Sequence, residues 1–353
     1  MRKRFALESK RLNKIVEMIV KLIQIDGELP NLALMKLAYH YKAIGAEVSF
    51  SHSVKRDLFE PVYDFVLASA IFQTSWKKIE LLKDFYPNAI VGGTAVSKKR
   101  EDTVENFLGI APDYKYLDYS FYPEFEYSIG MTHLGCSSSC GFCCVGEKEG
   151  SNRPLSNINE IWRGEPYPKK LILLDNDFQN RLGWQSICQE IIDGNFEVAF
   201  IQGMNLRKLT DEHIDYFKQI KFRDKNFQKK RFYCAWDNEK DIKKIERGLH
   251  ILEQANIQRS TVTPYFLCNY FRKGLTEDVW NRFLFMAERD LRPYAMIFEK
   301  WTLPPNDDLK IFQNWVNSHN AYANPTKEGF AEYKNYYQNK NKIYKEKQAE
   351  LFI

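Results

Sequence analysis

The chain has 353 residues, 44% of them hydrophobic, which is enough for the core of one large or two medium domains. Its formal net charge of +5 is mild and permits an anionic partner without indicating one. No segment approaches the roughly 20 consecutive apolar residues of a membrane span, and no apolar signal core follows the basic start. We therefore expect a cytoplasmic protein that crosses no membrane and keeps its cysteines reduced.

The first elements alternate between strand and helix. Residues 1–17 carry alternating charge and predict a solvated N-terminal arm. Residues 18–25 form a β-branched apolar run, typical of a buried strand. A helix should then begin at Asn31, a natural N-cap, and end at Gly45. Leu34, Met35, Ala38 and Tyr41 fall on one face of this helix, which should be buried.

The alternation continues to residue 98. Further strands are expected at residues 47–50, 65–72 and 89–91. Thr74 or Ser75 should cap a helix that ends at Phe85, and Gly92-Gly93 forms a turn after the last strand. Strands and helices that alternate at this spacing indicate βαβ units with a parallel sheet. Residues 18–98 are therefore predicted to form a small Rossmann-like, doubly wound domain.

A second α/β region follows a stretch without clear periodicity, residues 99–125, which we interpret as a linker. Its first strand should lie at residues 127–131. The later strands are expected at residues 170–175, 197–202, 231–236, 260–267 and 293–298. The helices between them are expected near residues 178–192, 210–220, 240–255 and 277–289. Six βα units predict a partial (βα)6 barrel over residues 126–303, and residues 304–353 a C-terminal helical extension.

Three cysteines dominate the loop that follows the first of these strands. Cys136, Cys140 and Cys143 have C-x3-C-x2-C spacing, and the residues between them are small and polar apart from Phe142. Such a loop can direct three sulfurs to one centre. Four thiolates close a [4Fe–4S] cluster, so three leave one iron without a protein ligand. An open coordination position is typical of a metal site that performs chemistry.

This cysteine loop, with Phe142 before the third cysteine, resembles the signature of the radical S-adenosylmethionine (SAM) superfamily. In that family SAM chelates the fourth iron, and its reductive cleavage gives a 5'-deoxyadenosyl radical that abstracts hydrogen from a substrate. The resemblance implies an enzyme with one [4Fe–4S] cluster, bound SAM and an external electron donor of the flavodoxin or ferredoxin type. Cys188, Cys234 and Cys268 are scattered and are expected to be inert core residues. The substrate is not indicated.

Polar residues that follow the predicted strands are candidates to hold SAM, because loops at strand C-termini bind ligands in such folds. Asp175 and Asp177 follow the strand at residues 170–175 and resemble acids that could hold the amino group of SAM. Gln202 ends the next strand, and Asp237 resembles the residue that holds the ribose hydroxyls. Asp177 and Asp237 could instead cap the helices that follow. Phe142 could shield the cluster or simply pack.

The N-terminal domain resembles the cobalamin-binding domain that precedes many radical SAM domains. The resemblance rests on the order of elements and on Gly92-Gly93. The D-x-H-x-x-G motif, which supplies a cobalt-ligating histidine, is missing: the loop after the first strand, residues 26–30, has no histidine. The nearest histidine, His40, falls inside the following helix. Cobalamin is therefore possible but not favoured, and the domain is expected to support the barrel or the substrate.

Two alternatives remain at this point. The three cysteines with Cys144 or His133 could bind structural zinc, which would make the chain a non-catalytic, metal-stabilised binding protein. The tail from Ala321 interleaves tyrosines with lysines and could bind single-stranded nucleic acid, or form an amphipathic helix that packs on the barrel. An iron–sulfur protein should be brown after anaerobic purification, whereas a zinc protein is colourless.

Overall fold

The computed structural model describes residues 18–109 and 117–350; the predicted N-terminal arm, residues 1–17, lies outside the described residues. The fold is α/β with parallel sheets, as expected. The chain divides into two compact units. The first comprises Met1–Ser139 and Cys143–Pro168, and the second Cys140–Phe142 and Lys169–Ile353.

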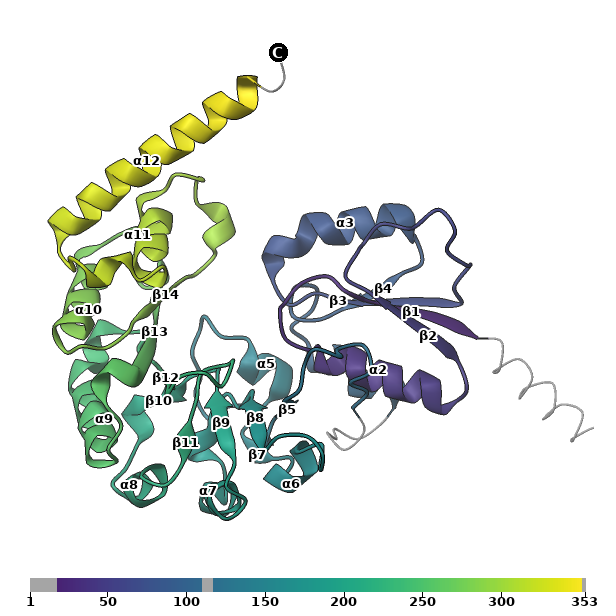
Figure 1. Ribbon diagram of the computed structural model, residues 1–353, viewed down its shortest axis with the longest axis horizontal. Coiled ribbons are helices and arrows are strands. Elements are labelled where there is room, and N and C mark those ends of the chain that lie inside the picture. The colour runs from purple at the N-terminus through teal and green to yellow at the C-terminus, as the bar shows by residue number, and fades with distance from the viewer. Residues whose placement is uncertain (1–17, 110–116, 351–353) are drawn as a thin grey trace, which may run out of the picture. The chain divides into compact units, whose positions relative to one another are not determined.

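The first unit is built on a parallel sheet of four strands in the order β2-β1-β3-β4. The strands are β1 (Ile19–Gln24), β2 (Glu47–Ser51), β3 (Phe65–Ser69) and β4 (Ile90–Gly92). Helix α2 (Leu32–Ala43) covers one face of the sheet and α3 (Trp76–Phe85) the other (Figure 1). Each strand is found where the sequence predicts one, although β3 ends earlier, at Ser69.

Each face of this sheet has its own apolar core. On the α2 side, the predicted helix face is buried as expected: Leu34, Met35 and Ala38 are at most 1% exposed. Asn31 caps α2 as predicted, because its side chain accepts hydrogen bonds from the backbone N–H groups of Ala33 and Leu34. Ser75 occupies the N-cap position of α3 but makes no capping bond. The helix start was therefore located correctly, without the predicted side-chain contact.

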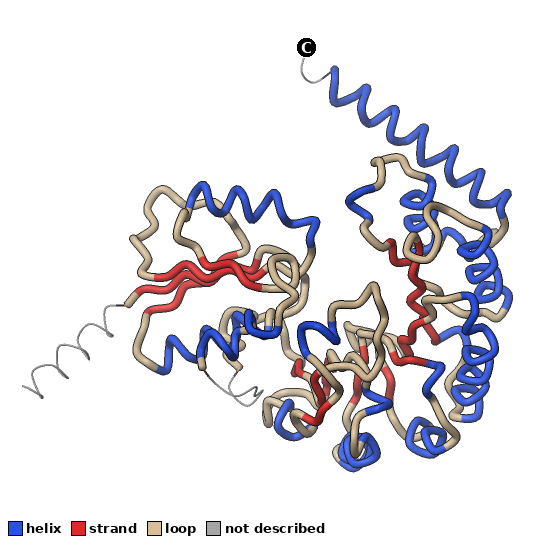
Figure 2. Tube along the Cα trace, turned by 180° about the vertical axis from the view of Figure 1, so that it is seen from behind, coloured by secondary structure: helices blue, strands red, loops and turns tan. Residues whose placement is uncertain are grey.

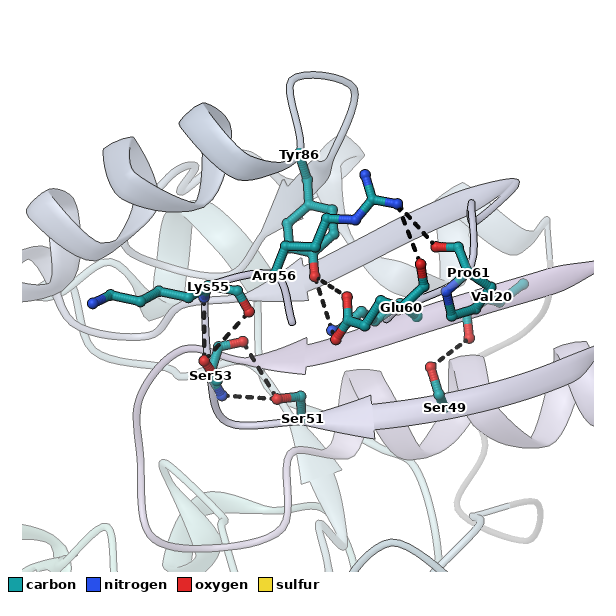
Figure 3. Close-up of polar contacts among 10 residues, drawn as sticks. Val20, Ser49, Ser51, Ser53, Lys55, Arg56, Glu60, Pro61 and Tyr86 are labelled. Atoms are coloured by element: carbon teal, nitrogen blue, oxygen red, sulfur yellow. Dashed lines mark hydrogen bonds and ion pairs between the residues drawn. The ribbon is translucent and has the colours of Figure 1, made fainter. Parts of the chain in front are cut away.

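A loop without a helix, residues 52–64, connects β2 to β3. Its first part is a series of short turns, in which Ser53 N donates to Ser51 Oγ and Lys55 N donates to Ser53 Oγ (Figure 3). Its second part is anchored by Glu60, which pairs with the amine of Lys21 and accepts a hydrogen bond from Tyr86 Oη. Lys21 lies within β1 and is only 3% exposed. An ion pair with a buried lysine thus anchors this helix-free loop to β1.

The segment predicted as a linker contributes structure to the first unit. It contains α4 (Val104–Leu108), and Phe121 stacks on Phe50 of β2 at a ring distance of 5.3 Å. Tyr122 Oη donates to Gln24 Oε1 at 2.7 Å. Aromatic packing of this kind leaves no periodic pattern in the sequence. The remaining elements of the unit are β5 (Ser128–Gly130), β6 (His133–Leu134), α5 (Val145–Glu149), β7 (Arg153–Pro154) and α6 (Ile158–Ile161).

The second unit contains two sets of parallel strands. One runs in the order β11-β9-β8 and the other β10-β12-β13-β14. The strands are β8 (Lys170–Leu173), β9 (Glu197–Phe200), β10 (Met204–Asn205), β11 (Lys221–Phe222), β12 (Phe232–Ala235), β13 (Val262–Cys268) and β14 (Tyr294–Ile297). The helices between them lie on the outer side of the strands (Figure 2). They are α7 (Trp184–Asp193), α8 (Glu212–Phe217), α9 (Ile242–Gln254) and α10 (Glu277–Glu288).

The C-terminal extension is helical, with α11 (Asp308–Asn317) and α12 (Lys327–Glu350). Phe330, in the first turn of α12, is 7% exposed and packs against Trp280 of α10 and Trp315 of α11. Lys334 pairs with Asp308 at 2.7 Å. The start of α12 therefore packs on its own unit. No helix in the described part of the chain is long and apolar enough to cross a membrane.

Candidate functional site

The cysteine loop begins with a tight turn in the first unit. Gly135 has a φ of +81°, and a Cβ there would lie 2.3 Å from the carbonyl oxygen of Ser151, so the position requires glycine. Cys136 N donates to the carbonyl oxygen of Gly150 at 3.2 Å. Ser138 N points at the Sγ of Cys136 at 3.4 Å. A backbone N–H that donates to a cysteine sulfur favours its thiolate form.

Cys143 and Cys144 lead into α5. Cys144 is the residue before the helix, and its carbonyl oxygen accepts a hydrogen bond from Lys148 N at 2.9 Å. Cys143 is exposed, whereas Cys136, Cys140 and Cys144 are half-buried. All four loop cysteines are therefore at least partly exposed to solvent.

The segment Cys140–Phe142 belongs to the second unit and lies against the loop that follows β13. A Cβ on Gly141 would come within 2.6 Å of the hydroxyl oxygen of Tyr270. The ring of Phe142 meets that of Tyr270 edge to face at 5.2 Å. Phe142 therefore packs on a neighbouring aromatic residue, which is compatible with shielding a bound group as well.

The cysteines outside the loop behave as core residues, as predicted. Cys188, Cys234 and Cys268 are at most 1% exposed. Burial raises the pKa of each thiol, in the case of Cys268 to about 12, so none of them forms a thiolate at neutral pH. His133, considered as a fourth zinc ligand, is fully buried in β6. Among the described residues, no group of three or more His, Cys, Asp or Glu side chains is arranged to hold a metal ion.

The donor chemistry of the loop nevertheless fits an iron–sulfur cluster. Thiolates are the ligands of such clusters, and the loop supplies accessible thiols on a backbone shaped by a required glycine. The N–H of Ser138 directed at Cys136 is the kind of contact that tunes a cluster's potential. The buried cysteines offer neither accessibility nor thiolate character.

The predicted acids after β8 are both deeply buried. Asp175 is 4% exposed and Asp177 is 1% exposed. Asp177 accepts a hydrogen bond from the Asn180 side-chain amide at 2.5 Å. It precedes the short 3-10 turn Phe178–Asn180 without a capping bond, and α7 begins only at Trp184. The helix-cap interpretation of Asp177 is therefore wrong, because a turn and Gly183 separate it from the helix.

Buried carboxylates need compensation, and Arg181 lies nearby. Burial lowers the pKa of Arg181, and the negative charge of Asp175 opposes that effect. The guanidinium of Arg181 also donates to the carbonyl oxygens of Leu182 and Gly183. The sequence gives no periodic signal for this arginine, which lies in an irregular segment before α7.

Gln202 lies in the turn after β9 and is exposed. The next residue, Gly203, has a φ of +85°, and a Cβ there would be 3.0 Å from the Tyr265 ring. The turn therefore keeps one shape, and Gln202 faces solvent at its tip. Because the carboxyl ends of parallel strands meet at one edge, Gln202 follows β9 at the same edge at which Asp175 follows β8.

Asp237, directly after β12, is also not a helix cap. The neighbouring residue Asn238 performs that function, since its Oδ1 accepts a hydrogen bond from Lys240 N at 3.0 Å. Burial raises the pKa of Asp237 to about 6, although the positive charges of Arg207 and Arg282 oppose the rise. A half-buried carboxyl with a raised pKa near a strand end is typical of a functional position.

Arg282 of α10 is the residue that sequence reasoning missed. It is 2% exposed and donates to three backbone carbonyl oxygens, those of Trp236, Asp237 and Leu267, and to the carboxylate of Asp278. It thus joins the ends of β12 and β13. The sequence could have indicated it, because Arg282 lies in the apolar stripe of α10, beside Val279, Phe283 and Met286. A charged residue on a buried helix face requires hydrogen-bond partners.

No family model matches this chain, and no curated protein is similar to it.

Proposed function

We propose that the protein is a radical SAM enzyme, in which Cys136, Cys140 and Cys143 bind a [4Fe–4S] cluster. The observation that carries the proposal is the C-x3-C-x2-C loop itself, with partly exposed cysteines and a backbone N–H directed at one sulfur. Bound together, the cluster and SAM supply a 5'-deoxyadenosyl radical that removes hydrogen from a substrate. Three protein thiolates leave the open iron position that this chemistry requires.

The second unit supplies the residues proposed to hold SAM. Asp237 accepts hydrogen bonds from the ribose hydroxyls, and Asp175 or Asp177 holds the amino group. Gln202 adds a polar contact from the exposed turn after β9, and Phe142 shields the cluster from water. Support comes from the position of these polar residues after parallel strands, where βα folds bind ligands.

The finer architecture forms part of the same proposal. The order β2-β1-β3-β4, with a helix on each face, supports a Rossmann-like N-terminal domain. Parallel strands with helices on their outer side support a partial barrel in the second unit. The electron would come from a flavodoxin- or ferredoxin-like donor, since no other cysteine-rich segment exists for a second cluster.

The deciding experiment is anaerobic purification followed by iron and sulfide analysis and incubation with SAM and a strong reductant. We expect a brown protein that slowly forms 5'-deoxyadenosine and methionine even without substrate. A Cys188→Ala variant is the matched control, because this cysteine is buried and should not change the iron content. A colourless protein that retains zinc and leaves SAM intact would contradict the proposal and favour a structural zinc site.

A further inference from the structure

A cavity of about 460 Å³ lies in the first unit, on the α2 side of the sheet. Its walls come from the start of α2, the ends of β3 and β4, and residues 96–107. This volume is within the range of small-molecule sites in proteins. The apolar side chains of Leu34, Leu37 and Leu67 form part of the wall and belong to the core on that side.

Three apolar residues at this cavity are unusually exposed. Ile90 is 45% exposed, Val96 42% and Phe107 49%. They come from a strand, a loop and a helix, and all three line the same cavity. A single exposed apolar side chain is common on protein surfaces. Three exposed apolar side chains that line one cavity are typical of a ligand-binding site.

Gly92 gives an independent indication. It is the last residue of β4, and a Cβ built on it meets no atom within 4 Å. Its φ lies outside the left-handed region, so the backbone does not require glycine. Gly92 pairs with Ser69 and lies two residues from Ile90, which pairs with Leu67 of the α2-side core. By strand alternation its missing side chain faces the cavity, and a glycine in a strand is typical of close approach by a ligand.

The charges at the cavity define what could bind there. Glu101 and Asp102 are the ionisable residues among the described residues that line it, and no described lining residue is basic. Asp102 accepts a hydrogen bond from Ser97 Oγ at 2.6 Å. Glu101 also forms an exposed ion pair with Lys99 at 3.7 Å. The two carboxylates and this lysine together carry a net negative charge, which disfavours phosphate, sulfate or carboxylate groups. The apolar wall favours a ligand with little charge.

We propose that this cavity binds an uncharged, largely apolar small molecule, with Gly92 kept small to admit it. The proposal does not depend on the cysteine loop or on SAM. Polar groups at the rim, such as the hydroxyl of Thr103 and the amide of Asn106, would orient the ligand through hydrogen bonds.

Two fluorescent probes with the same ring system test the proposal. N-phenyl-naphthylamine is neutral, and anilinonaphthalene sulfonate carries one negative charge. We expect the neutral probe to bind the full-length protein saturably and the anionic probe to bind about tenfold more weakly, because of the two carboxylates. Glu101→Gln combined with Asp102→Asn should raise the affinity for the anionic probe relative to the affinity for the neutral probe.

Gly92→Val places a branched side chain in the cavity and should weaken binding of the neutral probe several-fold. The matched control is Gly146→Val in α5, because that glycine also has open surroundings and an ordinary φ but lies outside the cavity. Phe107→Ser serves as a second variant if Gly92→Val does not fold, and it should weaken binding several-fold. The proposal is overturned if the neutral probe does not bind saturably, if a folded Gly92→Val variant binds it as well as the wild type, or if both probes bind equally.

Discussion

Arg282 donates a hydrogen bond of 3.1 Å to the backbone carbonyl oxygen of Asp237, and its positive charge also acts on the carboxyl group of the same residue. The guanidinium therefore fixes the backbone that carries Asp237 and limits the rise of its pKa. A buried arginine on α10 thus influences both the position and the pKa of the carboxyl group that follows β12. This relationship is internal to the second unit and can be tested without knowledge of the substrate.

Replacement of Arg282 by methionine should destabilise the protein by roughly 3–5 kcal/mol, because it leaves a carboxylate and three carbonyl groups without their donor. Arg282→Lys should recover only part of the loss, since lysine cannot reach several acceptors at once. Arg289→Met, at the C-cap of the same helix, is the matched control. Arg289 is more exposed and stacks on Phe285, so its loss should cost far less. Urea unfolding measures all three variants, and equal costs at residues 282 and 289 would refute the assignment.

The raised pKa of Asp237 predicts a pH dependence of SAM affinity. Above a pH of about 6 the carboxylate is formed and can accept hydrogen bonds from the ribose, so affinity should increase as the pH rises through that value. Asp237→Asn should remove this dependence, and Asp237→Ala should cost roughly 1.5–3 kcal/mol of binding. Isothermal titration between pH 5 and pH 8 measures the effect. SAM affinity that is the same in wild type and variant would exclude this contact.

The same pKa predicts an effect of opposite sign on stability. Since the pKa is higher in the folded state than the ordinary value of 3.8, the folded state holds the proton more tightly. This contribution is present at low pH and is lost as the pH rises from about 4 through about 6. Asp237→Asn should therefore raise the melting temperature at neutral pH but not at pH 4. A variant that melts lower at both values would contradict the argument.

Cysteine variants separate the predicted cluster ligands from their neighbour. Alanine at position 136, 140 or 143 should abolish the absorbance near ~400 nm that is typical of iron–sulfur charge transfer. Cys144→Ala should retain most of it, because Cys144 precedes α5 outside the three-cysteine spacing. The measurement is anaerobic spectroscopy with iron analysis. Loss of iron in Cys144→Ala alone would favour a closed site of four thiolates.

The Lys21–Glu60 pair should be important for the stability of the first unit. Burial raises the pKa of Glu60, but hydrogen bonds from Lys21 and Tyr86 outweigh this effect and lower it. Its contribution is therefore present above the ordinary pKa of 4.5 and is lost as the pH falls through the lower, folded-state value. Glu60→Gln should cost roughly 3–5 kcal/mol, because Lys21 stays buried without a counter-charge.

The control for this pair is the double replacement Lys21→Met with Glu60→Leu. Without any buried charge it should be more stable than Glu60→Gln alone, since well-packed apolar residues can replace a buried ion pair. Thermal unfolding of the three proteins at neutral pH gives the comparison. A double variant that is no more stable than Glu60→Gln would contradict this argument.

The first unit is expected to bind no cobalamin. The loop after β1 has no histidine, and Asp26 within it accepts hydrogen bonds from the backbone N–H groups of Ile71 and Phe72, which follow β3. His40 lies inside α2, as predicted. After incubation with excess hydroxocobalamin and desalting, cobalt should be near zero relative to cluster iron. Near-stoichiometric cobalt would overturn this expectation and shift the proposed reaction towards radical methylation.

The regular elements were predictable because their patterns are local. The apolar run before residue 25 and the stripe of α2 specify a strand and a helix, and both occur as expected. Ile245, Leu249 and Leu252 of the predicted stripe on α9 are buried, whereas Ile242, the first residue of the helix, is 37% exposed. The spacing of apolar residues predicts that a helix forms, but it does not predict how far along the helix the buried contacts extend.

Long-range polar contacts were not predictable from the sequence. The acid that pairs with Lys21 is 39 residues away in a loop without periodicity, and Arg282 reaches Trp236 across 46 residues. Lys21 and Arg282 are charged residues on the apolar, buried parts of their elements. Such a residue indicates that a buried partner exists, but its identity depends on how the chain folds. The cavity at Gly92 could not be predicted either, because it also depends on how segments distant in the sequence pack together.

The close approach of Gly141 to Tyr270 has a consequence for sequence variation. A side chain at position 141 would meet the hydroxyl oxygen of Tyr270, 129 residues further along the chain, so position 141 cannot take a larger residue while Tyr270 keeps its place. Among related chains, residues larger than glycine at position 141 should occur together with a smaller residue at position 270. The two positions would then be inherited as a pair, even though only one of them lies in the cysteine motif.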